Sequence, residues 1–361
     1  MGSFFYHGGN LREAKERFKL AEKKFIDFSA NINPLGFPTK IKTIIEKNIN
    51  QIACYSDPEY REFKLTLAEK INVSPHNILV GNGSMELIFL SIMCLLPQKV
   101  LIPIPTFSEY ERAAKMINCD CIFLRCKQSR NFQIDINEMI KYLPRVDLIF
   151  LCNPNNPTGT LIPKAEILYL LKKCLRYNVF LIIDETFINF LTDADKVTLI
   201  KEASKNSKLL VIRSLTKIFA IPGLRLGYIV GNKRLINNIS RYQPTWSVNT
   251  FAQLVGKEVL NDTRFISQTY ELINKEREIL FRNLKEIKGI IPFSSKTNFI
   301  LAQLTNPRIN SNELYNFLGK NGILIRDCSN FRGLNNRFIR ICVRTRKENL
   351  KLINNIKKIL R

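Results

Sequence analysis

The residue of this chain with the clearest chemical potential is a lysine in a polar turn. Lys217 follows two hydroxyl residues, Ser214 and Thr216, and Arg225 comes eight residues later with glycines on both sides. A lysine amine can form a Schiff base with an aldehyde, while hydroxyls and a guanidinium can bind a phosphate dianion from two sides. A surface charge in a strand–turn–strand segment is the simpler interpretation of Lys217 alone. Two further motifs upstream favour an aldehyde cofactor that carries a phosphate.

Both upstream motifs place polar side chains directly after an apolar run. The turn 153–159, rich in asparagine and proline, follows the run 148–151 and contains Asn156. Asp184 ends the run 181–183. Open α/β folds bind their ligands at the carboxyl ends of such strands. The order of an amide-rich turn, an acid and a lysine, spaced by roughly 30 residues each, is typical of successive βαβ units.

Pyridoxal 5'-phosphate requires these three kinds of residue. Its ring nitrogen needs an acid, its phenolate oxygen needs a hydrogen-bond donor, and its aldehyde needs a lysine. Asp184, Asn156 and Lys217 provide them in that order. An acid at the end of a strand can also be a simple helix cap, but the three motifs together predict a cofactor site with Lys217 and Asp184 as its catalytic residues.

With these motifs the chain resembles the class I and II aminotransferase superfamily, the fold-type I pyridoxal-phosphate enzymes, from about residue 20 to its C-terminus. The resemblance implies an α/β fold, in which a large domain with a mostly parallel sheet flanked by helices is joined to a smaller α+β domain. The cofactor would then be bound by Tyr55, Gly83, Ser84, Phe107, Asn156, Asp184, Ser214, Thr216, Lys217 and Arg225.

Several of these roles come from the resemblance residue by residue. The loop that contains Gly83 and Ser84 matches a phosphate-binding loop, where backbone N–H groups at a helix N-terminus hold an anion; its glycines alone are weak evidence. Phe107 matches the aromatic residue that stacks on the pyridine ring, although alone it would be a core residue. Tyr55 matches a tyrosine that reaches the cofactor phosphate of the neighbouring subunit, which implies a homodimer with shared active sites. Arg340 matches the arginine that binds the substrate α-carboxylate through a bidentate fork.

Four segments, at 7–13, 27–36, 243–249 and 322–328, closely resemble the threonine-phosphate decarboxylases of cobalamin biosynthesis. Those enzymes are similar in fold to histidinol-phosphate aminotransferases, but they convert L-threonine O-3-phosphate to (R)-1-amino-2-propanol O-2-phosphate. The resemblance implies that His7 and Arg326 bind the substrate phosphate and that Asn33 lies at the substrate end of the pocket. Alternatively, His7 could lie in a frayed terminus and Arg326 on an exposed strand.

Three functions remain open at this point. The first is the decarboxylase, with threonine phosphate or serine phosphate as its substrate. The second is an aminotransferase of the histidinol-phosphate type. Phe187, where many aminotransferases have a tyrosine, mildly favours the decarboxylase. The third, a basic nucleic-acid-binding or scaffold protein, is suggested by the net charge of +24. Because the 55 lysines and arginines are dispersed along the chain, we interpret them as solvated faces and expect no nucleic-acid partner.

The composition agrees with an intracellular enzyme. The nine cysteines are odd in number and scattered, and the two histidines complete no convincing metal cluster, so we expect reduced thiols, no metal site and a cytoplasmic location. No signal peptide is evident at the N-terminus, and no apolar run approaches the ~20 residues that a membrane span requires.

Apolar runs that alternate with helical stretches predict the domain organisation. We expect a segment at 1–45 that packs with the small domain, a large cofactor-binding domain at 46–248 and a small domain at 249–361. A long helical stretch is expected over 249–288. The strands are expected near 78–80, 99–103, 121–124, 147–151, 179–183, 208–213, 226–230, 298–303, 323–326 and 337–343.

Overall fold

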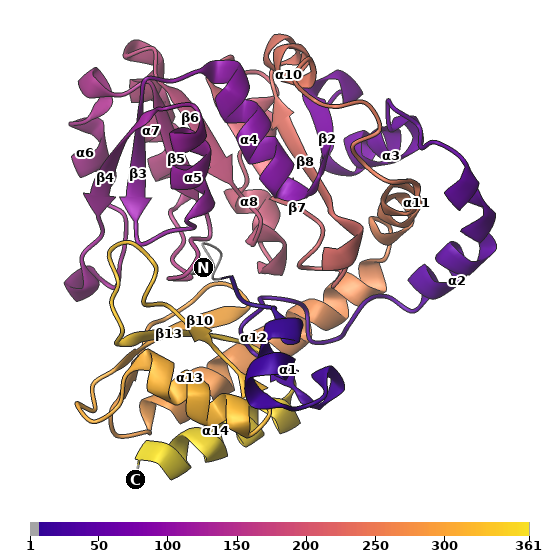
Figure 1. Cartoon of the computed structure of the whole chain (residues 1–361). Helices are drawn as coiled ribbons and strands as arrows, with labels where there is room; N and C mark the ends of the chain where they lie inside the picture. The colour runs from indigo at the N-terminus through magenta and orange to yellow at the C-terminus, as the bar shows by residue number, and fades with distance from the viewer. Residues whose placement is uncertain (1–6, 361) are drawn as a thin grey trace.

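The computed structural model describes residues 7–360, and its larger part is built on a seven-stranded sheet (Figure 1). The strand order is β2-β8-β7-β6-β5-β3-β4, and all neighbours are parallel except β8, which is antiparallel to both of its neighbours. The strands are β2 (Ile78–Asn82), β3 (Lys99–Ile104), β4 (Asp120–Arg125), β5 (Leu148–Cys152), β6 (Phe180–Asp184), β7 (Leu209–Ser214) and β8 (Leu226–Gly231).

Helices cover both faces of this sheet, which explains why its central strands are almost continuously apolar. In β5, Leu148 and Phe150 pack on one face while Ile149 and Leu151 pack on the other. The first face is covered by α4 (Gly83–Leu95), α5 (Glu109–Met116) and α10 (Lys233–Ser240). The second face packs against α6 (Ile136–Ile140), α7 (Lys164–Arg176) and α9 (Ile200–Ala203), and α3 (Arg61–Ile71) and α11 (Thr250–Val259) join the same core.

The smaller part contains a four-stranded antiparallel sheet in the order β12-β13-β10-β9. Its strands are β9 (Ile290–Pro292), β10 (Phe299–Leu304), β12 (Arg326–Asp327) and β13 (Phe338–Cys342), and its helices are α12 (Thr263–Lys285), α13 (Ser311–Lys320) and α14 (Arg346–Leu360). The N-terminal segment joins it: β1 (Ile26–Asp27) pairs with β11 (Ile323–Leu324), and α1 (Leu11–Phe18) packs so closely on α13 that a Cβ at Gly319 would collide with Phe18.

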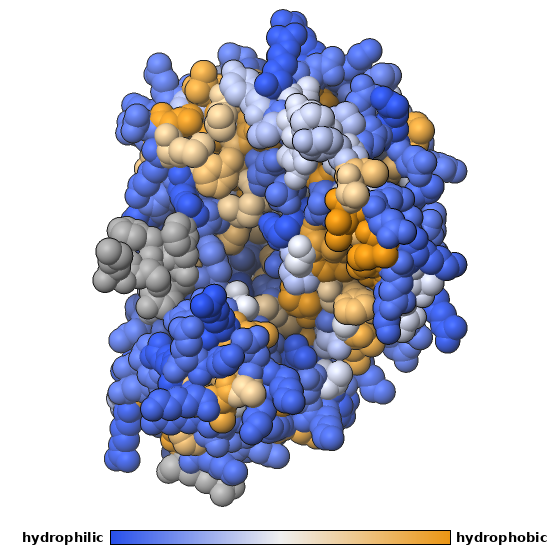
Figure 2. Space-filling view, turned by 45° about the vertical axis from the view of Figure 1, so that its right-hand side comes forward, coloured by the Kyte–Doolittle hydropathy of each residue, from blue (hydrophilic) through white to orange (hydrophobic). Residues whose placement is uncertain are grey.

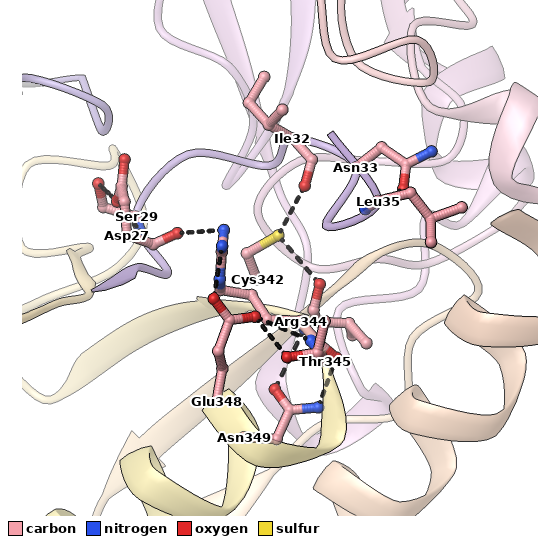
Figure 3. A network of polar contacts seen from close by, with 11 residues as sticks. Asp27, Ser29, Ile32, Asn33, Leu35, Cys342, Arg344, Thr345, Glu348 and Asn349 are labelled. Atoms are coloured by element: carbon pink, nitrogen blue, oxygen red, sulfur yellow. Dashed lines mark hydrogen bonds and ion pairs between the residues drawn. The ribbon is translucent and has the colours of Figure 1, made fainter. Parts of the chain in front are cut away.

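The loop after β1 is joined to the small domain by a network of polar contacts (Figure 3) and to the large domain by a backbone hydrogen bond. On the small-domain side, Arg344 donates a hydrogen bond to the carbonyl of Asp27 at 3.1 Å and pairs with Glu348 at 2.8 Å. On the large-domain side, the backbone N–H of Asn33 donates to the carbonyl of Lys217 at 3.1 Å. The loop therefore fixes the position of the turn that carries the predicted cofactor lysine.

The structure confirms the predicted α/β architecture and most of the predicted strands, with one difference in the strands and one in the helices. The strand expected near 323–326 is two short strands, β11, which pairs with β1, and β12, which pairs with β13 of the small sheet. The single helical stretch expected over 249–288 is two helices, α11 and α12, because Asp262 caps the start of α12 by accepting from the N–H of Phe265 at 3.1 Å. Helix α11 contacts α3, α2 (Lys40–Lys47) and β8 of the large sheet, and we therefore propose that the small domain begins at α12. Among the helices of residues 7–360, none combines the length and hydropathy of a membrane-spanning segment.

Candidate active site

Side chains from both parts of the molecule line one cavity of about 190 Å³ at the carboxyl ends of β5, β6 and β7. Parallel strands bring their carboxyl ends to the same edge of a sheet, so residues that are far apart in sequence meet here. The predicted site residues that line this cavity are His7, Ser84, Phe107, Asn156, Asp184, Ser214, Thr216, Lys217, Arg225, Arg326 and Arg340.

Lys217 lies in the turn that follows β7, and its surroundings favour the neutral amine. Burial, together with the positive charges of Arg340 and Arg225, lowers the pKa of Lys217 to about 8. A lysine with such a pKa is a nucleophile at near-neutral pH, because a substantial fraction of its amine is unprotonated. Ser214 and Thr216 share a hydrogen bond of 2.7 Å between their hydroxyls in the same turn.

Asp184 ends β6 and is only 3% exposed. The hydroxyl of Tyr110 donates to its Oδ2 at 2.7 Å, and the N–H of Thr186 donates to its Oδ1 at 2.9 Å. Burial raises the pKa of Asp184, and these hydrogen bonds only partly oppose the effect. A cation beside this carboxylate would be strongly stabilised, since a buried charge without a partner is costly.

The N-terminus of α4 and Arg225 form a cradle for an anion. Gly83 has a φ of 79°, and a Cβ at this position would collide with the guanidinium of Arg225. A Cβ at Gly227 would lie 2.8 Å from the backbone nitrogen of Ser84. Both positions need glycine because these donors approach so closely. The free N–H groups of the first turn of α4, the Ser214 and Thr216 hydroxyls and Arg225 together suit a phosphate.

Arg340 connects β13 of the small sheet to the asparagine-rich turn of the large domain. Its guanidinium donates to Oδ1 of Asn156 and, at 2.7 Å, to the carbonyl of Ser29. Burial lowers the pKa of Arg340 to about 10, so it remains a cation at neutral pH. Because the Asn156 oxygen accepts from Arg340, the amide nitrogen of Asn156 remains available as a donor for a cofactor oxygen.

A second pair of basic residues lines the cavity near Phe331. Arg326 donates to the carbonyl of Asp327 and, at 2.7 Å, to Oδ1 of Asn330. Its guanidinium lies 5.1 Å from the centre of the Phe331 ring. The Nε2 atom of His7 lies 2.8 Å from Oε1 of Glu109. Arg340 forms one positively charged region of the cavity and Arg326 with His7 forms a second, in addition to the cradle at Arg225.

Three predicted residues do not line the cavity of this chain: Gly83, which belongs to the Arg225 cradle, Tyr55 and Asn33. Tyr55 is 81% exposed and stacks on Trp246 with 4.5 Å between ring centroids. Asn33 is buried, and its amide donates to the carbonyl of Ile218 and to Oγ1 of Thr269, both at 2.7 Å. Both of its amide hydrogens are therefore used within the protein. We propose that Asn33 positions the Lys217 turn; the contact of Asn33 with substrate stays a prediction.

The sequence interpretation did not include several residues that line or support the cavity. Tyr110 lies in the first turn of α5, three residues after Phe107, which precedes the helix in the loop after β3. Asn31 lies in a segment already noted for its resemblance. No local sequence pattern indicated Thr186, Phe331 or the contact of Glu109 with His7, because their place at the cavity depends on the tertiary arrangement.

Unpaired polar atoms show what kind of ligand the cavity suits. Among the described residues, Nε of Arg340, Oγ1 of Thr186 and Oδ1 of Asn31 are buried without a hydrogen-bond partner, and all three residues line this cavity. Buried polar groups are normally paired. Together with the anion cradle, the acid and the lysine, they fit a polar, phosphate-bearing ligand, and they match the requirements of pyridoxal 5'-phosphate.

Three curated relatives match almost the whole chain. A protein of Caldanaerobacter subterraneus subsp. tengcongensis, provisionally named as a threonine-phosphate decarboxylase, is 39% identical over 98% of this chain and 93% of its own length. The threonine-phosphate decarboxylase of Salmonella typhimurium is 33% identical over 98% and 96%. A bifunctional adenosylcobalamin biosynthesis protein of Leptospira interrogans is 35% identical over 96% of this chain and 40% of its own length.

A structural relative and a family model agree with these matches. The crystal structure of the histidinol-phosphate aminotransferase from Clostridium acetobutylicum aligns with a TM-score of 0.86 and 35% identity, covering 92% of this chain and 98% of that one. The family model described as aminotransferase class I and II matches residues 23–356. The superfamily predicted from the sequence is confirmed, and the chain belongs to the aminotransferase class I and II family.

Proposed function

We propose that this chain is a pyridoxal-phosphate-dependent decarboxylase that converts L-threonine O-3-phosphate to (R)-1-amino-2-propanol O-2-phosphate in cobalamin biosynthesis. The observation that carries the proposal is the number of positively charged regions in the cavity. The cradle at Arg225 takes the cofactor phosphate, which leaves Arg340 for the substrate carboxylate and Arg326 with His7 for a second anion. An amino acid that carries a phosphate has both groups. The relatives named for threonine phosphate and for adenosylcobalamin support the same assignment.

The bound cofactor supplies an electron sink for the electrons that remain at Cα when CO₂ leaves. The residues of the chain supply the rest. Lys217 would hold the cofactor through its aldehyde between turnovers and could return a proton to Cα. Asp184 would keep the proton on the ring nitrogen through its buried charge. Arg340 and Arg326 would bind the two ends of the substrate and thereby fix which bond of Cα is presented for cleavage.

The first prediction separates decarboxylation from transamination. With L-threonine O-3-phosphate as the sole substrate, we expect the enzyme to release CO₂ and aminopropanol phosphate over many turnovers, because the amino group leaves with the product. An aminotransferase of the histidinol-phosphate type is the second candidate, supported by the Clostridium structure. It would stall without 2-oxoglutarate and would form glutamate. Stoichiometric glutamate without CO₂ contradicts the proposal.

Parallel reactions with serine phosphate measure the contribution of the substrate methyl, for which we expect ~1–3 kcal/mol of discrimination.

We propose that the active protein is a homodimer with shared active sites. Exposed apolar side chains are concentrated between residues 35 and 55, with Ile52 at 71% and Tyr55 at 81% exposure. Figure 2, in which the right-hand side of Figure 1 with α2 is turned forward, shows a group of hydrophobic residues to the right of the centre of the view. An exposed apolar patch of this kind is typical of an interface. A second copy would bury this face and bring Tyr55 to the cofactor phosphate of its partner.

The dimer prediction can be tested by complementation. We expect the Tyr55→Ala and Lys217→Ala variants to be poorly active alone. After subunit exchange, half of the dimers combine the two variants, and each of these has one site with both residues intact. About a quarter of the parental activity should therefore return. Light scattering gives the oligomeric state of each sample. A fully active monomer, or no recovery on mixing exchanged subunits, contradicts the proposal.

We also propose a cytoplasmic location. All nine cysteines are free, and most are buried. Burial raises the pKa of the Cys126 thiol to about 12, and Cys174 and Cys342 show the same effect for the same reason. Such thiols are unreactive and agree with a reducing compartment.

A further inference from the structure

The contact between His7 and Glu109 joins the two parts of the molecule at the edge of the cavity. His7 belongs to the N-terminal segment, which is held on the loop after β1: Gly9 N–H donates to Oγ of Ser29 at 2.8 Å, and a Cβ at Gly8 would collide with the carbonyl of Ser29. Glu109 is the first residue of α5 in the large domain and is 3% exposed. The close fit at Gly8 limits where His7 can lie.

The environment of Glu109 keeps it ionised. Burial alone would raise its pKa, but the hydrogen bond from His7 and the contact with Arg112, whose Nη1 lies 3.2 Å from Oε2, outweigh this effect, so the pKa of Glu109 is lowered. Each carboxylate oxygen therefore faces a basic nitrogen. A buried carboxylate is also common as a stabilising acid in the first turn of a helix, which is the structural alternative for Glu109.

The carboxylate determines what His7 can do toward an anion. With Oε1 as an acceptor 2.8 Å from Nε2, the proton is placed on Nε2, and Nδ1 is the nitrogen that remains for the cavity. In neutral imidazole that nitrogen would be an acceptor and would repel a phosphate oxygen. It can donate only in the imidazolium, which a neighbouring carboxylate stabilises.

The other charged groups around His7 explain why a positively charged imidazole there needs the neighbouring carboxylate of Glu109. Four cationic side chains line the same cavity and disfavour a further positive charge on His7, whereas Glu109 favours it by direct contact. The charged side chains that line the two cavities adjoining His7 or contact Glu109 are Glu13, Arg17, Arg112, Asp184, Lys217, Arg225, Arg326, Asp327 and Arg340.

We propose that Glu109 is a positioning residue that holds His7 as an imidazolium, so that Nδ1 donates to the substrate phosphate. This inference rests on the proposed function. It adds Glu109 as the residue that keeps His7 positively charged for binding the substrate phosphate. Recognition of the phosphate then involves α5 as well as the N-terminal segment and Arg326.

The first test follows His7 directly by NMR. The chain has two histidines, His7 and the exposed His76, so ¹³Cε1-labelled histidine gives one signal for each. In the protein loaded with pyridoxal phosphate, we expect inorganic phosphate to shift the Cε1 signal of His7 in the parent protein and much less in Glu109→Gln, while the signal of His76 does not respond. An equal response of His7 to phosphate in the parent protein and in Glu109→Gln overturns the inference.

The second test uses kinetics and a double-mutant cycle. We expect Glu109→Gln and His7→Ala each to raise KM for L-threonine O-3-phosphate about tenfold, with no further rise when they are combined. Unphosphorylated threonine should be affected far less. Glu138→Gln, which removes a surface carboxylate paired with Lys141 at 2.6 Å, is the matched control and should leave both substrates unaffected.

The outcomes separate the inference from the proposed function. Additive losses in the double variant, or equal losses with threonine, would show that Glu109 only stabilises α5 and would overturn the inference. A parent protein that releases no CO₂ but still shows the phosphate response of His7, reduced in Glu109→Gln, would refute the decarboxylase and support the role of Glu109.

Discussion

Substitution of Lys217 by alanine is expected to remove the visible absorbance band of the attached cofactor and to lower turnover by at least about four orders of magnitude. Lys217 is the one lysine among the described residues that lines the cavity. No other amine is therefore placed to bond the aldehyde, and no other amine there can return a proton to the substrate. Absorbance of the purified protein and the rate of CO₂ release measure the two effects.

Lys208 provides a matched control, because it also lies beside β7 but packs over the Phe180 ring at 3.8 Å and does not line the cavity. Lys208→Ala should keep the band and the turnover.

The pKa of Lys217 at about 8 gives a second check. Since only the neutral amine attacks an aldehyde, the rate at which cofactor-free parent protein binds the cofactor should rise with pH until about 8 and then level off. Retention of the band in Lys217→Ala would refute the assignment.

The predictable part of the site is the part encoded in short segments. Asp184 ends an apolar run, and Asn156 and Lys217 lie in the turns that follow two others; a parallel sheet brings the carboxyl ends of such runs together. Local sequence was therefore enough to predict that these three side chains share a cavity. The same reasoning predicted a close approach at the glycines that flank Arg225. This holds at Gly227, where a Cβ would lie 2.8 Å from the backbone nitrogen of Ser84, but not at Gly223, which has open space around it.

The remaining part depends on contacts between segments that are distant in sequence. Glu109 and His7 are 102 positions apart, and Tyr110 and Asp184 are 74 apart, so no spacing rule relates them. Asn33 shows the reverse case. Its segment resembles a substrate-binding segment, but both of its amide hydrogens bond to Ile218 and Thr269. A resemblance identifies the loop, whereas the partners of one amide depend on how the two domains pack.

Substitution of Asp184 by asparagine is expected to leave cofactor binding largely intact and to lower turnover by about a thousandfold or more. The cradle at Arg225 and Lys217 would still hold the cofactor, because neither depends on the carboxylate. Asparagine has no charge with which to keep the ring nitrogen protonated, so the electrons left at Cα would no longer be stabilised. Cofactor content and turnover, measured on the same sample, separate binding from chemistry.

Tyr110→Phe distinguishes the charge of Asp184 from its hydrogen bonds. It removes the 2.7 Å hydrogen bond to Oδ2 but leaves the carboxylate and the 2.9 Å bond from Thr186. A hydrogen bond to a charged group contributes ~1.5–3 kcal/mol, which corresponds to a loss of roughly ten- to a hundredfold at most. We therefore expect Tyr110→Phe to be clearly more active than Asp184→Asn. Equal activities of the two variants would show that Asp184 acts through its orientation by Tyr110 and not through its charge. Near-parental turnover of Asp184→Asn would show that Asp184 is only a structural residue at the end of β6.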